Sequence, residues 1–231
     1  MPPRRKKKFQ SNKAIGNARP PYVEYNPHSE KAPIVRNQNI LVTSIDPGTT
    51  NCGIYVSYYD TDTEKHKSLY LECVQFNDGE NHYITSMEKL DQLEEDYKFF
   101  SSSQYIVIES QMHNVNLNTR ICQHLISYFM TKFKDKGNRP IVVEIASQAK
   151  YRMLKCPLGM EKTRRKNWAA KKAVELLRER ENDTDELEHI CEIESSSKRD
   201  DMGDAVCQYY AFFEMLKGKF GRPTMPVRLE T

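Results

Sequence analysis

Three aspartates stand at the start of an apolar stretch near the end of the chain, in the segment SKRDDMGDAVCQYYAFF. Asp201 and Asp204 are three residues apart, so in a helix both side chains project from one face, one turn above the other. The helix dipole favours acids in a first turn, but a third acid, Asp200, adds repulsion between like charges. Helix capping is the ordinary role for Asp200, and a cation held between the other two is the alternative for the cluster.

Two further acids follow apolar runs that we expect to be strands. Asp46 follows ILVTSI and precedes a Pro-Gly pair, and Glu109 follows YIVI. Taken alone, Asp46 is an ordinary turn former and Glu109 an ordinary strand end. Strand ends and the first turn of a covering helix can meet in one crevice, where buried carboxylates need counter-charge. Oxygen-only ligand sets suit Mg²⁺ or Mn²⁺, and two such ions can assist hydrolysis of a phosphodiester.

The charge of the chain is unevenly distributed. The 231 residues carry a net charge of +3 and suffice for one domain with tails. Residues 1–36 hold nine Lys or Arg against two Glu, and residues 148–180 hold eleven against three. Residues 181–201 reverse the sign, with nine acids against two basic residues. Two basic surfaces beside an acidic site suit a polyanion bound next to a metal centre.

The sequence argues against a membrane, secreted or zinc-thiolate protein. It has no apolar run of about 18 residues, and its N-terminus lacks the apolar core of a secretory signal. The six cysteines are scattered without a C-x-x-C pair, which indicates reduced, mostly buried thiols in an intracellular protein.

The order of apolar patterns predicts an α/β domain over residues 38–218, between a disordered basic tail (1–37) and a short C-terminal tail (219–231). We expect a mixed five-stranded sheet, with three antiparallel strands followed by parallel ones, flanked by helices. The expected strands are 40–45, 52–59, 67–76, 104–110 and 139–146, and the expected helices are 84–100, 116–133, 148–154, 163–180 and 200–216. Residues 181–199 are expected to form an acidic loop.

The ordered set SIDPGTTNCGI, YIVIES, ASQAK and KRDDMGDA resembles the RuvC-like Holliday junction resolvases, in the form carried by poxviruses and other large DNA viruses. These enzymes belong to the RNase H-like superfamily, and the resemblance covers residues 38–217. It implies an RNase H-like fold and a structure-selective endonuclease that cuts four-way DNA junctions, leaving 5′-phosphate and 3′-hydroxyl ends. It also implies one or two Mg²⁺ or Mn²⁺ ions per active site, a homodimer, and a viral replication site in the cytoplasm or nucleus.

The resemblance assigns roles to individual residues. The metal ligands and catalytic acids fall on Asp46, Glu109, Asp201 and Asp204, and a catalytic lysine on Lys150, with Lys166 as second candidate. His113 is a minor candidate for assisting the metal or water. The basic block is expected to bind the DNA backbone, together with Tyr151 and Trp168, although a lone tryptophan on a helix is more often core. Its expected DNA-binding residues are Lys150, Arg152, Lys155, Lys162, Arg164, Arg165, Lys166 and Lys171.

Helix 116–133 is the expected dimer interface, with Cys122, Ile126 and Tyr128 beside its core stripe. The stretch IDPGTTNCG also resembles the phosphate loop of actin-like ATPases, but the chain lacks their second domain and Gly-rich adenosine segment, so we expect no nucleotide cofactor. Two alternatives stay open: another RNase H-like nuclease acting on RNA–DNA hybrids or flaps, and a non-catalytic DNA-binding module. The PPRRKKK segment fits a nuclear localisation signal and a nonspecific DNA arm equally well.

Overall fold

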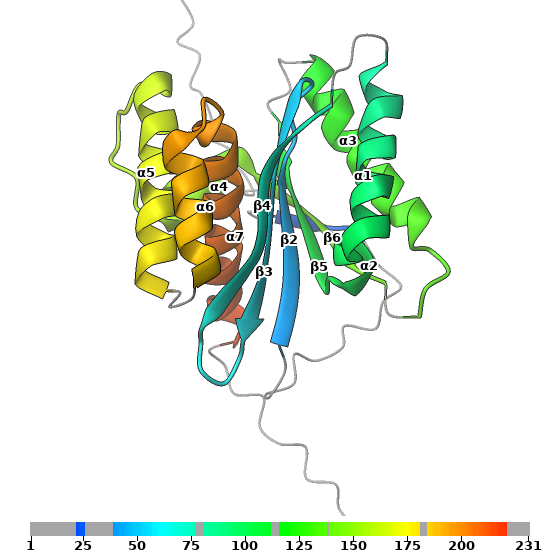
Figure 1. Ribbon diagram of the computed structural model, residues 1–231, viewed down its shortest axis with the longest axis horizontal. Coiled ribbons are helices and arrows are strands. Elements are labelled where there is room, and N and C mark those ends of the chain that lie inside the picture. The colour runs from blue at the N-terminus through cyan, green and yellow to red at the C-terminus, as the bar shows by residue number, and fades with distance from the viewer. Residues whose placement is uncertain are drawn as a thin grey trace, which may run out of the picture.

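Six strands form one mixed sheet at the centre of the molecule (Figure 1). The computed structural model describes residues 22–25, 39–76, 81–111, 116–137, 139–180 and 184–220. The strands are β1 (Tyr22–Glu24), β2 (Asn39–Asp46), β3 (Asn51–Asp60), β4 (His66–Gln75), β5 (Tyr105–Ser110) and β6 (Ile141–Ala146). They lie in the order β1-β6-β5-β2-β3-β4, with β2, β3 and β4 antiparallel and β2, β5 and β6 parallel. The predicted mixed α/β sheet is therefore confirmed.

Helices cover both faces of this sheet. Figure 1 shows α4 to α7 on one side and α1 to α3 on the other. The helices are α1 (His82–Tyr97), α2 (Phe99–Ser102), α3 (Asn116–Lys132), α4 (Ser147–Met153), α5 (Lys162–Arg180), α6 (Thr184–Ser195) and α7 (Arg199–Phe220). Strand residues alternate between two cores: Val42 and Tyr55 pack under α7, whereas Leu41 and Ile54 pack under α3. The central strands β2, β3 and β5 are thus buried on both faces, as their nearly continuous apolar runs predict.

The sheet has one strand more than the sequence predicted. β1 comes from the segment that was expected to be disordered, and it pairs antiparallel with β6 at the edge of the sheet. The prediction of disorder is therefore wrong for these residues. Three residues without a long apolar run give too short a pattern for a strand to be recognised, because pairing with β6 is what stabilises it.

Two helical segments also differ from the prediction. The expected acidic loop contains α6, whose Ile190 and Ile193 are buried against α7 and β4. Their three-residue spacing was hidden among the acids of this segment, of which Glu188 and Glu194 are exposed. The helix expected over residues 84–100 ends at Tyr97, because Lys98 adopts a left-handed conformation (φ 58°) before α2 begins.

The sequence also predicted that the chain has no membrane-spanning helix and that its cysteines are reduced and mostly buried. Within the described part of the chain, no helix is both long and apolar enough to cross a membrane. All six cysteines are free thiols, and Cys52, Cys122 and Cys207 are buried. Residues 1–21, 26–38 and 221–231, as well as His113, lie outside the described residues.

Candidate active site

Two of the candidate acids meet because their strands are parallel neighbours. Ile45 of β2 lies opposite Ile108 of β5, so the residues that follow them, Asp46 and Glu109, stand side by side at the carboxyl edge of the sheet. Glu109 is buried and Asp46 half-buried. The two acids are 63 positions apart in the sequence, and only the parallel register brings them together.

Helix α7 carries the other acids across this edge and is fixed to the strands by polar side chains. The amide Nε2 of Gln208 donates to the carbonyl oxygens of Ile45 (3.1 Å) and Val107 (3.0 Å), just before the two strand acids. The hydroxyl of Ser44 donates to the carbonyl oxygen of Ala205 at 2.8 Å. All these groups are buried, so breaking a bond would leave an unpaired polar atom in the core.

Two glycines allow the first turn of α7 to approach its neighbours. A Cβ at Gly53 of β3 would lie 2.3 Å from the backbone oxygen of Asp201. A Cβ at Gly203 would lie 2.7 Å from Cα of Ala170 on α5. Both contacts are with backbone, which cannot rotate away, so only glycine permits this packing. The Gly in DDMGDA therefore serves helix packing, while the acids on either side face the sheet edge.

Lys150 lies between the carboxylates. It follows β6 on the short helix α4, is only 3% exposed, and is charged within a cluster of acids. Its Nζ is 2.5 Å from Oε2 of Glu109 and 2.8 Å from Oδ1 of Asp204. Lys166, the second candidate for the catalytic lysine, instead pairs with Asp200 in the first turn of α7. The structure thus brings Lys150, and not Lys166, into direct contact with the central acids.

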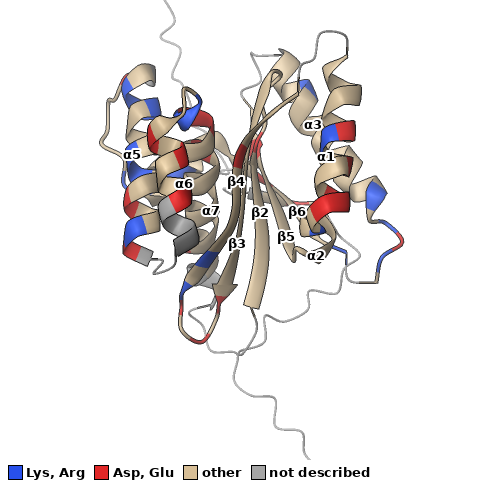
Figure 2. Ribbon diagram, viewed as in Figure 1, with Lys and Arg blue, Asp and Glu red and all other residues tan. Residues whose placement is uncertain are grey.

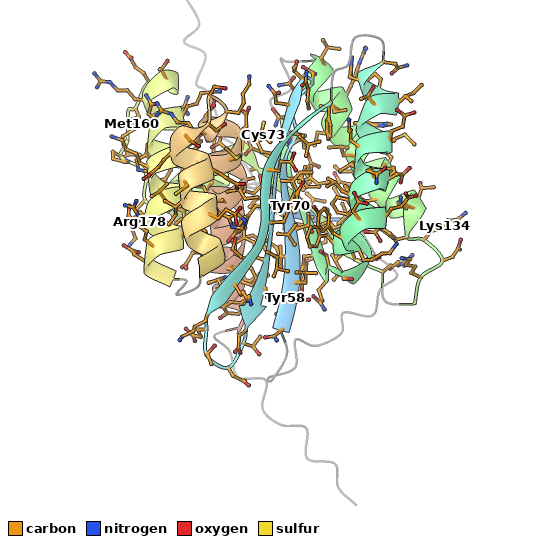
Figure 3. All side chains as sticks on the ribbon, in the orientation of Figure 1. Tyr58, Tyr70, Cys73, Lys134, Met160 and Arg178 are labelled. Atoms are coloured by element: carbon orange, nitrogen blue, oxygen red, sulfur yellow. The ribbon has the colours of Figure 1, made fainter. Side chains whose placement is uncertain are left out.

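Asp200 and Asp201 lie on the outer side of the cluster. The Lys166–Asp200 ion pair ties α5 to α7 and gives Asp200 a partner other than a cap. Asp201 is half-buried, and the thiol of Cys73 on β4 lies 3.9 Å from its Oδ2. In Figure 3 Cys73, which contacts Asp201, lies at the same end of the molecule as Met160 in the loop between α4 and α5. Tyr58 lies at the opposite end.

The charged forms of the carboxyl groups are disfavoured, first by burial and then by the neighbouring acids. Burial, followed by the charge of Glu109, raises the pKa of Asp46 well above its usual value. Burial raises the pKa of Glu109 to about 7 although Lys150 opposes the shift. Burial also raises the pKa of Asp201, with Asp200 adding to the effect. Burial opposes the charge of Lys150, but Glu109, Asp204 and Asp46 outweigh it and raise its pKa. One ammonium group therefore does not balance the surrounding carboxylates.

The donor set fits a hard divalent cation. The described residues contain no group of three or more His, Cys, Asp or Glu side chains already arranged around a metal position, and Lys150 lies among the acids instead. However, the central donors are all carboxylate oxygens, which Mg²⁺ and Mn²⁺ prefer. Oδ1 of Asp204 is buried and faces Nζ of Lys150 at 2.8 Å, the same ammonium group that pairs with Glu109. The carboxylate charge that this one lysine leaves uncompensated is what a cation would satisfy.

A basic surface adjoins the acids. Arg152, Lys155, Arg164 and Lys171 are exposed on α4, on α5 and in the loop between them, and Figure 2 shows Lys and Arg along α5. Arg165 is half-buried, with its guanidinium 5.6 Å from the centre of the Tyr151 ring. Trp168 is also half-buried, against the core and 5.8 Å from Tyr151 between ring centres. The side chain of Lys162 lies outside the described residues.

Sequence reasoning missed the residues that hold the acids in place. Gln208 is the one polar side chain in the run AVCQYYAFF, and Ser44 interrupts the run ILVTSI. A buried polar residue in an apolar run needs a partner, so both offered a signal. Cys73 offered none, because a cysteine in a strand is usually ordinary core.

Solved structures with a similar fold come from three sources. The yeast mitochondrial Holliday junction resolvase Ydc2 has a TM-score of 0.57 at 15% identity, covering 82% of this chain and 86% of its own. The fowlpox virus resolvase, in complex with Holliday junction DNA, has a TM-score of 0.51 at 15% identity, covering 77% and 99%. Thermus thermophilus RuvC has a TM-score of 0.50 at 14% identity, covering 76% and 96%. This chain has the fold of the RuvC-like resolvases.

The resolvase fold is recognised here through three-dimensional structure. No protein-family model matches the sequence, and no curated protein matches it. The resemblance predicted from the four motifs is confirmed at the level of fold.

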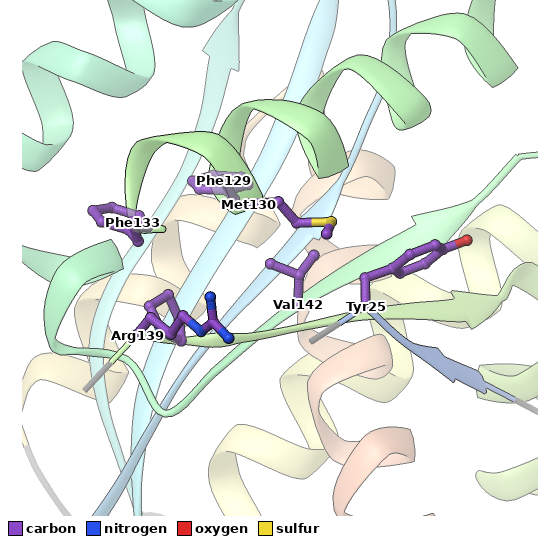
Figure 4. Close-up of a pocket in the computed structure, with 7 residues that line it drawn as sticks. Tyr25, Phe129, Met130, Phe133, Arg139 and Val142 are labelled. Carbon is purple, nitrogen blue, oxygen red and sulfur yellow. The ribbon is translucent and has the colours of Figure 1, made fainter. Parts of the chain in front are cut away.

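The prediction that Cys122, Ile126 and Tyr128 of α3 belong to a dimer interface is wrong for these residues. Their side chains are buried in the core that α3 forms with the sheet and α1, because the helix turns its widest apolar stripe inward. The exposed apolar residues of α3 are Leu117 and Met130. Met130 borders a hollow between α3 and β6, shown in Figure 4, that is lined by Tyr25, Phe129, Met130, Phe133, Arg139, Pro140 and Val142.

Proposed function

We propose that this protein is a structure-selective endonuclease that resolves four-way DNA junctions by metal-dependent phosphodiester hydrolysis. The observation that carries the proposal is the cluster of Glu109, Asp204 and Lys150 beside Asp46 at the carboxyl edge of the sheet. The fold supports it, since the similar structures include the yeast mitochondrial Holliday junction resolvase Ydc2 and the fowlpox virus resolvase bound to Holliday junction DNA.

In this proposal Asp46, Glu109, Asp201 and Asp204 hold one or two Mg²⁺ or Mn²⁺ ions. Such ions polarise phosphate oxygens and make bound water a stronger nucleophile, which gives 5′-phosphate and 3′-hydroxyl ends when the leaving group is the 3′ oxygen. The role of this chain is to hold the acids on rigid elements: two strand ends and one helix that Gln208 fixes to both strands. Lys150 contacts both Glu109 and Asp204 and supplies a cation next to the reacting phosphate.

The exposed cations of α4 and α5 bind the DNA backbone in this proposal. Their placement next to the acids puts a phosphate-binding surface beside the cleavage site, and neutralising phosphates is the main source of affinity for DNA. Arg165 and Tyr151 form a cation–aromatic pair on the same rim, suited to contact with sugar and base at a branch.

Cutting two opposing strands of a junction requires two active sites, so we propose a homodimer. The exposed apolar residues Leu117 and Met130 on α3 support an interface on this helix, with the hollow of Figure 4 beside it. Residues Ile84 and Met87 of α1 add exposed apolar surface on the same side of the sheet.

The test is cleavage of a labelled four-way junction against a matched linear duplex, an RNA–DNA hybrid and a flap, in Mg²⁺ and in EDTA. Paired symmetric nicks in the junction, absent in EDTA, are expected. Asp204→Asn should abolish nicking and leave junction binding largely intact, while Asp96→Asn, on the exposed surface of α1, serves as the matched control. Cleavage of the hybrid alone would instead indicate an RNase H-type activity. Mg²⁺-dependent nicking by Asp204→Asn would contradict the assignment of the four acids as metal ligands.

A further inference from the structure

Arg165 is a half-buried arginine that pairs with no carboxylate in the part of the chain that the structure describes. It lies near the start of α5, and its Nε is buried without a hydrogen-bond acceptor. Other cations of the same helix differ, since Lys166 pairs with Asp200 and Arg178 pairs with Glu194. Taking a guanidinium partly out of water without an acceptor costs free energy, which a bound anion would offset. The environment of Arg165 therefore indicates an anion-binding residue.

The ring of Tyr151 places this arginine next to the candidate active site. The guanidinium carbon of Arg165 is 5.6 Å from the centre of the ring, and Nζ of Lys150 is 5.5 Å from the same centre. The ring of Trp168 on α5 lies beside that of Tyr151, with 5.8 Å between their centres. Because Lys150 contacts the central acids, Arg165 lies one aromatic ring away from them.

The anion that fits this position is a phosphate of the DNA backbone. Arginine presents a planar fork of N–H donors that matches phosphate oxygens, and an aromatic ring beside it limits its orientations. Two cations at these distances from one ring centre are at most about 11 Å apart, a separation of about one or two nucleotide steps along a strand. With Lys150 beside the cleaved phosphate, Arg165 reaches a neighbouring phosphate of the same strand.

We propose that Arg165 binds one phosphate of the cleaved strand, next to the cleaved bond, and thereby sets which bond reaches the acids. The inference rests on the proposed function, because it assigns Arg165 to the strand that is cut. The exposed cations of α4 and α5 add affinity wherever the backbone passes. Arg165, held by the ring of Tyr151, instead fixes the position of the strand along the site.

The test removes single charges from the DNA and the matching charge from the protein. Four-way junctions that each carry one neutral methylphosphonate at a defined position of the cleaved strand are nicked by excess enzyme in Mg²⁺. A methylphosphonate at the phosphate held by Arg165, within about two nucleotides of the nicked bond, should slow wild-type nicking roughly 10- to 100-fold, as expected for a lost charge-assisted hydrogen bond. Arg165→Gln should slow nicking of the unmodified junction by a similar factor and keep the wild-type Tm, since the described residues show no ion pair to lose.

The two changes should fail to add at one position only. Arg165→Gln should nick the junction modified there no more slowly than the unmodified one, and it should keep the wild-type sensitivity at the other positions. Arg120→Gln, an exposed arginine on α3 across the sheet, is the matched control and should keep the wild-type sensitivity at every position. Losses that add at every position for Arg165→Gln would overturn the assignment of Arg165. A wild type that nicks no junction would refute the proposed function instead.

Discussion

Replacing Glu109 by Gln should stabilise the metal-free protein, although it removes one of the proposed metal ligands. Glu109 is buried beside two other acids and a single lysine, and its pKa is raised from 4.5 to about 7. A shift of this size corresponds to ~3 kcal/mol of unfavourable ionisation in the folded state. Glutamine keeps an acceptor for Lys150 but carries no charge. In a domain of this size ~3 kcal/mol corresponds to a rise in Tm of about 6–12 °C.

The pH dependence follows from the sign of the shift. A carboxyl with a raised pKa in the folded state is protonated there without cost below about pH 4.5, the unfolded value. The cost of ionising it grows between pH 4.5 and about 7 and is complete above that range. The stability difference between Glu109→Gln and wild type should therefore be near zero at pH 4.5 and largest at pH 8.

The assay is thermal or urea unfolding in EDTA across this pH range, repeated in Mg²⁺. Glu88→Gln, on the exposed surface of α1, is the matched control and should show no pH-dependent gain. Mg²⁺ should raise the Tm of the wild type more than that of Glu109→Gln, because the ion binds the folded state through the carboxylate that the variant lacks. A variant that is no more stable than wild type at pH 8 in EDTA would refute the argument that the acids are under-compensated.

Two further substitutions test how the site is held together. Gly53→Ala places a Cβ against the backbone of Asp201, so α7 must move. We expect this variant to lose about 1–3 kcal/mol of unfolding free energy in urea and to nick junctions more slowly. Gly137→Ala, which has open space around it, is the control and should behave as wild type in both assays. Lys150→Met should destabilise the protein by about 3–5 kcal/mol at pH 8 in EDTA, since it leaves the buried carboxylates without a counter-charge. Lys166→Met removes a half-exposed ion pair and should cost less than about 1 kcal/mol, so equal losses for the two lysine variants would contradict the central position of Lys150.

The residues that supply the acids could be predicted from sequence because each stands where a pattern changes. Asp46 and Glu109 end apolar strands, and Asp201 and Asp204 open an apolar helix, so local pattern alone placed them at element ends. The resemblance already ranked Lys150 above Lys166, but the burial of Lys150 between two carboxylates needed the structure, because it depends on the path of α4 after β6.

What the sequence could not show are features that depend on distant partners. β1 is three residues long and exists through its pairing with β6, more than a hundred residues away. The wrong assignment of Cys122, Ile126 and Tyr128 to an interface has a related cause: α3 is apolar over a broad face, and sequence does not say how much of that face the sheet and α1 cover. Cys122 and Ile126 turned out to be on the covered part.

The position of Lys150 links the stability of the fold to its proposed chemistry. In the metal-free protein its ammonium group partly neutralises Glu109 and Asp204, so the acids can be brought together before any ion binds. Because one positive charge is too few for the cluster, the site retains a strong attraction for further cations. A second lysine in the same place would satisfy the acids and weaken that attraction, whereas an apolar residue would leave them without a counter-charge and destabilise the fold. A single buried lysine is therefore the arrangement that allows folding without metal and still favours binding it.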